Sequence, residues 1–205
     1  MIKNHQLPIA VFVCITLALT SGCKSKHLKT IGAIIAVGVA AKIIYDMVIA
    51  QRSEQTENDQ KVVEKYKKEF KQLPAEPQLI NYESSIMPGA VVNPGNSVSI
   101  QSSLEVVRGS TTELVEIKER ITIYDNEDPT KPLKSLEKVI NQETQKCGAF
   151  KNEFTFTLPK GMPQGVYPVT TTVIVDGKEF SAVQNKMQLV QTGNLINANE
   201  LIAAN

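Results

Sequence analysis

The side chains that could do chemistry in this chain are few, and both histidines lie near its N-terminus. They are His5 and His27, so the chain beyond residue 27 lacks the commonest general base and the commonest metal ligand. Serines are numerous, but a Ser-His-Asp arrangement needs a histidine, and no GxSxG, HExxH or P-loop motif occurs. The sequence therefore argues against an enzyme, and we expect no cofactor, no bound metal and no small-molecule substrate.

Two groups of acidic residues could bind a metal ion or act as paired catalytic carboxylates. Asp125, Glu127 and Asp128 in YDNEDPTKP could offer oxygen ligands to calcium, but the turn lacks a glycine and a later bidentate glutamate. We favour a solvated loop there. The glutamates at 113, 116 and 119 do not alternate strictly with period two, so their spacing does not bring paired carboxylates together. An enzyme acting on envelope glycans is therefore the least favoured hypothesis.

The three cysteines occupy different settings. Cys14 lies inside an apolar run near the N-terminus, Cys147 stands alone in QKCGAF, and Cys23 lies in LTSGCKSK. We interpret Cys147 as a turn residue and expect no disulfide, because Cys23 has a more specific explanation.

Residues 1–22 have the order of a secretory signal: Lys3, an apolar core from Leu7 to Leu19, and then small residues. The core is too short to cross a bilayer comfortably, which takes about 20 residues. Ser21, Gly22 and Cys23 resemble the lipobox of bacterial lipoproteins, although Thr20 replaces the usual leucine and Leu19 comes one position early.

The resemblance implies cleavage between Gly22 and Cys23 and attachment of lipid, including palmitate, to Cys23. Two or three acyl chains anchor a protein stably where one is marginal. Lys24 follows the cysteine instead of aspartate, which in such lipoproteins implies the outer membrane, with the protein facing the periplasm. Residues 23–30 would then form a lipidated linker.

A second apolar segment, residues 31–50, reads IGAIIAVGVAAKIIYDMVIA and contains Lys42 and Asp46. Small residues at Gly32, Ala36 and Ala40 would let helices approach closely. Three interpretations remain open: a transmembrane helix, a helix buried on the chain's own domain, and a helix associated with the leaflet or with copies of itself. We favour the last, because a spanning segment so soon after a lipidated cysteine is unusual.

Residues 51–76 are polar and predict a helical stalk. The stretch QRSEQTENDQKVVEKYKKEFKQ lacks glycine and proline, and Val63, Tyr66, Phe70 and Leu73 give a narrow apolar stripe. Pro74 and Pro77 end the helical pattern. Together with residues 31–50, the stalk predicts a long N-terminal helix.

Residues 77–191 change to a period of two. In LVEIKERITIY, for example, Val115, Ile117, Ile121 and Ile123 share one face, while charged residues alternate with them. Turn dipeptides such as Asp176-Gly177 separate the strands. We expect about seven antiparallel strands in an immunoglobulin-like β-sandwich, over residues 78–84, 97–107, 114–124, 133–141, 150–158, 166–175 and 179–190.

Tyr167 follows a proline-rich corner in LPKGMPQGVYPV. It resembles the corner tyrosine of immunoglobulin and fibronectin type III sandwiches, whose hydroxyl returns to upstream backbone. The chain has no tryptophan, so the antibody Cys-Trp-Cys framework is absent. Residues 192–205 form a tail that could be a short amphipathic helix.

Charge excludes one further class. Lysine and arginine total 22 against 21 acidic residues, so no basic footprint for nucleic acid exists. The sequence favours a lipid-anchored, non-enzymatic binding or structural subunit of an envelope assembly, with a protein partner or self-association. The alternative is a membrane-active or tethering protein that oligomerises through residues 31–50.

Overall fold

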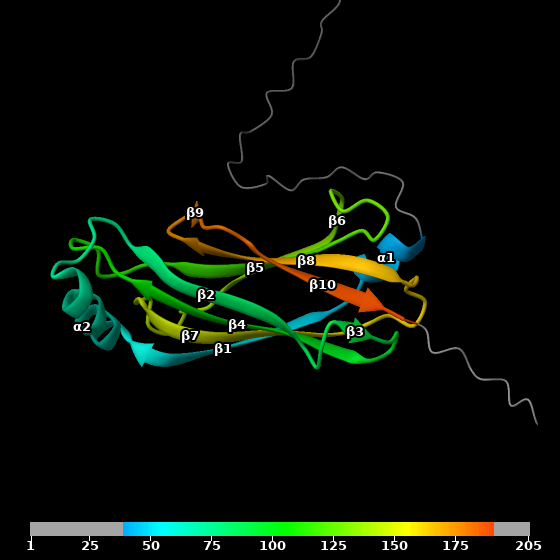
Figure 1. Ribbon diagram of the computed structural model, residues 1–205, viewed down its shortest axis with the longest axis horizontal. Coiled ribbons are helices and arrows are strands. Elements are labelled where there is room, and N and C mark those ends of the chain that lie inside the picture. The colour runs from blue at the N-terminus through cyan, green and yellow to red at the C-terminus, as the bar shows by residue number, and fades with distance from the viewer. Residues whose placement is uncertain (1–38, 191–205) are drawn as a thin grey trace, which may run out of the picture. The chain divides into compact units, whose positions relative to one another are not determined.

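The computed structural model describes residues 39–190, which form a sandwich of two β-sheets (Figure 1). The signal peptide, Cys23, Gly32, Ala36 and the tail lie outside the described residues. The prediction of a mainly β sandwich is confirmed. The number of strands is larger than expected, since the described residues contain ten instead of seven.

The first sheet, sheet A, has four antiparallel strands in the order β1-β7-β4-β2. Their bounds are Ile49–Asn58 for β1, Gly148–Thr157 for β7, Ser97–Val107 for β4 and Gln78–Met87 for β2. β4 agrees residue for residue with its prediction. β1, the first strand of the described residues, pairs with β7, which comes much later in the chain.

The second sheet, sheet B, has the order β3-β10-β8-β5-β6, and β9 pairs with β8 off this path. The strands are Val91–Val92 (β3), Val183–Leu189 (β10), Gly165–Val175 (β8), Ile117–Tyr124 (β5), Pro132–Val139 (β6) and Lys178–Glu179 (β9). The pairing of β3 with β10 is parallel and the other pairings are antiparallel. Asp176 and Gly177 both have positive φ in the tight turn between β8 and β9, as the Asp-Gly dipeptide predicted.

Between the two sheets, the described residues form two apolar clusters. One gathers Ile44, Ile100, Phe154, Tyr167 and further residues, and the other gathers Leu104, Ile117, Phe150 and their neighbours. Each cluster combines inward-facing side chains of both sheets, because alternate residues of a strand point to the same face. The residues that separate the two clusters are polar and are described with the candidate site.

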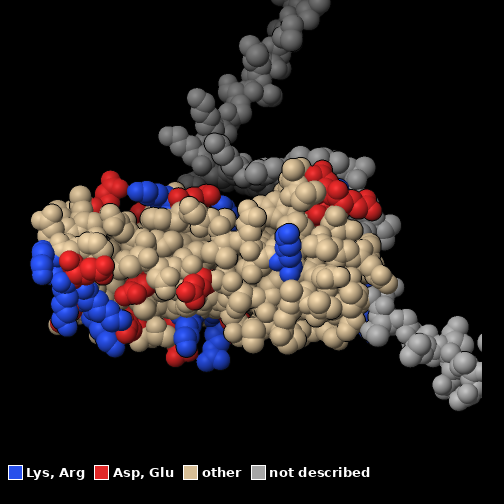
Figure 2. Space-filling view, in the orientation of Figure 1, with Lys and Arg blue, Asp and Glu red and all other residues tan. Residues whose placement is uncertain are grey.

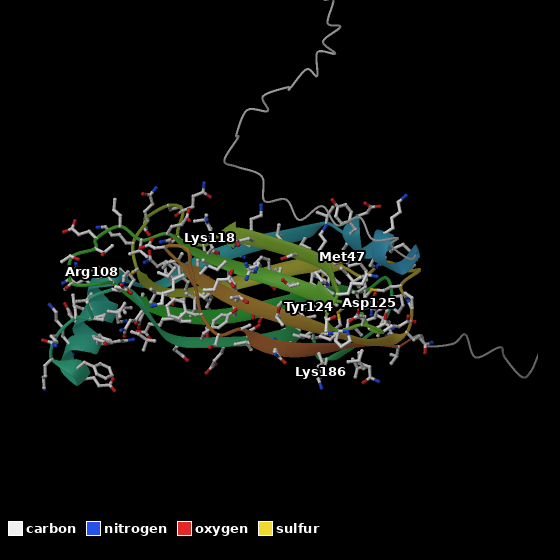
Figure 3. All side chains as sticks on the ribbon, turned by 90° about the horizontal axis from the view of Figure 1, so that it is seen from above. Met47, Arg108, Lys118, Tyr124, Asp125 and Lys186 are labelled. Carbon is white, nitrogen blue, oxygen red and sulfur yellow. The ribbon has the colours of Figure 1, made fainter. Side chains whose placement is uncertain are left out.

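Two helices lie at opposite ends of the sandwich (Figure 1): α1, Val39–Tyr45, and α2, Asp59–Phe70. Ile44 and Met47 belong to the first apolar cluster, whereas α2 buries Val62 and Val63 against Val107 of β4. Asn58 caps α2 by accepting a hydrogen bond from the backbone N–H of Lys61 at 3.0 Å. Figure 3 shows Met47 and Arg108 at these two ends.

The predicted long N-terminal helix is wrong over the part that the structure describes. α1 ends at Tyr45, so residues 46–50 do not continue the apolar helix predicted for 31–50, and residues 49–58 form strand β1. Of the polar helical stalk predicted for 51–76, the part over α2 is confirmed, whereas residues 51–58 belong to β1 and the chain after α2 leads to β2. The physical reason is tertiary: pairing with β7 overrides the helix propensity of the segment.

Within residues 39–190, no helix has the length and apolar character that crossing a bilayer requires.

Candidate interaction site on the outer face of sheet A

The outer face of sheet A carries ordered rows of polar side chains. The strand register sets Glu54, Lys151, Ser103 and Glu83 side by side across all four strands. The next row on the same face consists of Arg52, Glu153, Gln101 and Ser85. Charges of opposite sign are therefore cross-strand neighbours in both rows at the β1–β7 pairing.

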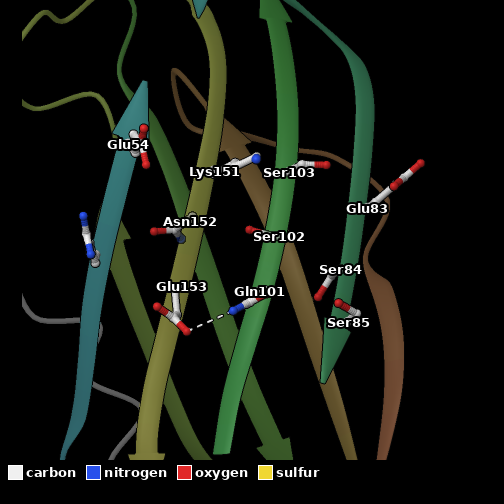
Figure 4. Close-up of a pocket in the computed structure, with 11 residues that line it drawn as sticks. Glu54, Glu83, Ser84, Ser85, Gln101, Ser102, Ser103, Lys151, Asn152 and Glu153 are labelled. Carbon is white, nitrogen blue, oxygen red and sulfur yellow. Dashed lines mark hydrogen bonds between the residues drawn. The ribbon is translucent and has the colours of Figure 1, made fainter. Parts of the chain in front are cut away.

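These rows line a shallow hollow of about 460 Å³ (Figure 4). Gln101 donates a hydrogen bond to Glu153 at 3.1 Å, and this bond is the main reason that the pKa of Glu153 lies below its ordinary value. Exposed side chains on the rim and floor include Arg52, Glu54, Glu83 and Lys151. The lining contains no aromatic residue, so it suits hydrogen bonding and charge pairing more than stacking.

A buried carboxylate lies beneath this face. Glu119 of β5 has no exposed surface, and it accepts hydrogen bonds from the hydroxyls of Tyr82 at 2.6 Å and Ser102 at 2.8 Å. The side-chain amide of Asn152 also donates to it. All three of these donors are neutral side chains, so hydrogen bonds and not a basic group compensate the charge of the carboxylate.

Burial is the largest influence on Glu119 and raises the pKa of its carboxyl, while the three hydrogen bonds act in the opposite direction. A raised pKa is a property of catalytic acids. Glu119, however, is enclosed in the sandwich, and Ser102 and Asn152 stand between it and the hollow. In this arrangement the carboxylate accepts hydrogen bonds inside the sandwich and does not line the hollow.

The hydrogen bonds around Glu119 extend to the edge strand β1. Asn152 Oδ1 accepts a hydrogen bond from the Ser53 hydroxyl at 2.7 Å and another from the amide of Gln51. The inward-facing row of sheet A here is entirely polar, since Ser84, Ser102, Asn152 and Ser53 are successive cross-strand neighbours. Together with Glu119 these residues form a polar layer between the two apolar clusters.

The other residues singled out by the sequence lie away from this site. Tyr167 is fully buried, and its hydroxyl donates to the carbonyl oxygen of Pro163 at 2.9 Å, the upstream contact expected of a corner tyrosine. Cys147 is buried, and burial raises the pKa of its thiol to about 12. The side chain of Ala40, in α1, is not described.

The acidic loop after β5 is tied to its own backbone. Asp125 accepts a hydrogen bond from the N–H of Glu127 at 2.9 Å, and Asp128 accepts from the N–H of Thr130 at 3.0 Å. Among the described residues, no cluster of three or more His, Cys, Asp or Glu side chains could hold a metal ion.

On the face drawn in Figure 2, lysine and arginine side chains gather over the end of the sandwich that carries α2.

Sequence reasoning missed Glu119 and the role of β1. A signal for Glu119 was present, because it occupies a position between Ile117 and Ile121 on the apolar face of its strand. No comparable signal marks residues 51–58, whose alternating burial is not accompanied by alternating hydrophobicity.

The fold and this face define a β-sandwich domain with an open polar sheet. No protein-family model matches the chain, and a search of curated proteins gave no match. Similar solved structures include a CARDB domain from Pyrococcus furiosus, in complex with di-metal ions, with 14% identity and a TM-score of 0.36 over 57% of this chain and 96% of that one. The sporulation control protein Spo0M of Bacillus subtilis has 12% identity and a TM-score of 0.33, over 56% of this chain and 49% of that one.

The alkylpurine DNA glycosylase AlkC of Pseudomonas fluorescens is also similar, with 17% identity and a TM-score of 0.33 over 56% of this chain. Only 30% of the glycosylase is covered. Similarity at these levels assigns no activity to the chain, and the functional argument therefore rests on its own residues.

Proposed function

We propose that this protein is a lipid-anchored, non-enzymatic binding or structural subunit of a cell-envelope assembly. The observation that carries the proposal is the open face of sheet A, on which exposed charged and amide side chains stand in register across four strands. Such a surface is ordered before binding, because each row is fixed by backbone pairing, and pre-ordered surfaces lose less entropy on association.

The anchor is proposed from the sequence alone. Cys23 follows Ser21 and Gly22 at the end of an apolar core, and residues 24–38 separate it from the first described residue, Val39. With lipid on Cys23, the sandwich would be held at the periplasmic surface of the outer membrane, as Lys24 implies by resemblance. The sandwich then acts as the part that meets a protein partner.

The alternative is an oligomerising membrane helix over residues 31–50, and the C-terminal part of that segment does not fit it. Ile44 is fully buried and Met47 is 6% exposed in the first apolar cluster. These side chains belong to the core of the sandwich and are not available to lipid or to a neighbouring helix.

Two measurements test the proposal. Cells expressing the chain are labelled with palmitate, and we expect label on the wild type and none on Cys23→Ser. Crosslinking in intact cells, followed by mass spectrometry, should give crosslinks from the lysines of the sandwich to a defined envelope protein or to a second copy. Lys151→Glu should lose them, while Lys186→Glu, exposed on β10 of the other sheet, should keep them.

An unlabelled wild type would overturn the anchor. Crosslinks that are equally strong in Lys151→Glu and in the wild type would overturn the role of the sheet A face. Turnover of an envelope glycan that is abolished by substituting one carboxylate would overturn the non-enzymatic assignment.

A further inference from the structure

Strand β1 leaves one backbone edge of sheet A unpaired. It pairs with β7 along one side and is the last strand in the order β1-β7-β4-β2. No strand between residues 39 and 190 pairs with its other side. Figure 4 shows β1 at this border of the sheet, with Glu54 on it. Unpaired backbone donors and acceptors are a template for another strand.

The edge lacks two of the usual protections against pairing. Residues 49–58 contain no proline and no lysine, and the strand is regular until a bulge between Gln55 and Glu57. Arg52 and Glu54 are exposed on the outer face, two positions apart, with Ser53 between them on the inner face. The charges are thus of opposite sign and symmetric about Ser53.

We propose that two copies of the protein associate by antiparallel pairing of β1 with β1, about a two-fold axis at Ser53. In this register Arg52 lies opposite Glu54 of the partner subunit, and Glu54 lies opposite Arg52 of the partner subunit. Both pairs fall on the outer face of the sheet. Two four-stranded sheets then continue into one another across the interface.

The charges select this register over its neighbours. A two-fold axis at residue 52 would place the two Arg52 side chains opposite each other, and an axis at residue 54 would do the same with Glu54. Parallel pairing in register would also oppose like charges. Since like charges directly opposite destabilise a sheet and opposite charges stabilise it, the axis at Ser53 is preferred.

The inner face of β1 fits the same arrangement. Gln51, Ser53 and Gln55 line a recess of about 380 Å³ on the open side of the sandwich, between β1 and the connection from β6 to β7. With the axis at Ser53, Gln51 lies opposite Gln55 of the partner subunit. Amide side chains both donate and accept hydrogen bonds, so Gln51 and Gln55 can hydrogen-bond to each other across the interface. Apolar side chains at these positions would instead have to be buried in a core.

This proposal deepens the proposed function by naming a second copy of the chain as one partner, and it rests on the sandwich being an interaction module. It does not depend on lipid at Cys23. The pairing also brings the polar outer faces of two sheets into one surface, which doubles the area presented to a further component of the assembly.

The test exploits the symmetry of the charges. The full chain, purified in detergent, is studied by sedimentation and native mass spectrometry as wild type, Arg52→Glu and Glu54→Arg. Each single variant replaces two attractive cross-strand pairs by two repulsive ones, and we expect self-association about tenfold weaker than in the wild type. An equal mixture of the two variants restores opposite charges at both pairs and should form a mixed dimer as readily as the wild type.

A matched control lies on the other sheet, outside the hollow. Lys186→Glu places a comparable charge change on the exposed face of β10, and it should leave self-association unchanged. To report the register directly, Arg52→Cys is mixed with Glu54→Cys under mild oxidation. The disulfide between positions 52 and 54 should then exceed any disulfide between two identical variants.

A wild type that stays monomeric at about 100 μM would overturn the proposal, as would variants that associate like the wild type or a mixture without mixed dimers. The palmitate experiment on Cys23→Ser is independent. A lost label with intact pairing supports both the anchor and the dimer, whereas an unlabelled wild type that still pairs overturns the anchor alone.

Discussion

Strand β7 has two antiparallel neighbours, β4 and β1, and different interactions hold them in place. The inner face of β4 is apolar and buried at Val98, Ile100, Leu104 and Val106, with Ser102 as its polar exception. The inner face of β1 is half-buried and, after Ile49, polar at Gln51, Ser53 and Gln55. Both strands nevertheless pair with β7 over most of its length.

The comparison separates backbone pairing from core formation. Pairing continues on both sides of β7, but apolar burial, which dominates the free energy of folding, is concentrated on the β4 side. β1 is secured by its ends, where Ile44 and Met47 enter the core and α2 docks on Val107, and by the hydrogen bonds of Asn152. An edge strand held in this way can be specific without contributing much to the core.

The largest expected effect compares the two residues that flank Phe154. Ile100 of β4 and Gln51 of β1 are its cross-strand neighbours on the two sides. Ile100→Ala should lower the free energy of unfolding by about 2–5 kcal/mol, because it removes a fully buried side chain and leaves a cavity. Gln51→Ala should cost about 1 kcal/mol or less. Urea denaturation measures both, and equal losses would show that β1 carries as much of the core as β4.

The second prediction concerns the N-terminal attachment of β1. Ile44→Ala empties a fully buried position just before the strand and should cost about 2 kcal/mol. Because the lost contacts hold the start of β1, amide hydrogen exchange should accelerate in residues 49–53 more than in β4. Tyr45→Ala, at an exposed neighbour, is the control and should leave exchange unchanged. Uniform acceleration in both strands would mean that β1 does not open separately.

The same contrast explains which parts of the fold the sequence could predict. The strand prediction for β4 is correct residue for residue, because NSVSIQSSLEVV alternates and one face is buried. The helix prediction over β1 is wrong, since QRSEQTEN offers good helix formers and no apolar alternation. Its strand conformation depends on the exposed edge of β7, which is distant in sequence and carries no local signal.

The candidate site was predictable only in part. Because alternate residues of a strand share a face, Ile117 alone is enough to predict that Glu119 lies on the apolar face. Its partners Tyr82, Ser102 and Asn152 come from three other strands, and only the register of sheet A brings them together. The rows on the outer face of sheet A likewise required the order of the strands, which single-strand periodicity does not contain.

A smaller effect is expected at Gly148 of β7, beside the end of β1. Gly148 has a φ of +156°, and a Cβ built there would lie 2.5 Å from the carbonyl oxygen of Glu57. Gly148→Ala should therefore displace the end of β1 near the bulge and cost about 1–2 kcal/mol. Gly89→Ala, where a Cβ would meet nothing within 4 Å, is the matched control. If thermal unfolding of the two variants agrees, the bulge region adapts without strain.

The smallest effect at neutral pH is expected for Glu119→Gln, because the replacement keeps the shape of the side chain. The Gln oxygen can take the place of Oε2, which faces Ser102 and Asn152, and its amide can donate to the Tyr82 oxygen after the hydroxyl rotates. The polar layer would remain hydrogen-bonded, so we expect a change of about 1 kcal/mol or less in the free energy of unfolding.

The pH dependence of that substitution has a definite sign. Burial raises the pKa of Glu119 in the folded protein above the ordinary glutamate value of about 4.3. Between those two values the folded state binds more protons than the unfolded state, so the contribution of Glu119 to stability is complete below the ordinary value and is lost as pH rises through the folded one. The wild type should therefore gain stability relative to Glu119→Gln as pH falls. Urea titrations of both proteins measure this difference. If the wild type instead loses stability relative to Glu119→Gln as pH falls, the hydrogen bonds to Glu119 lower its pKa more than burial raises it.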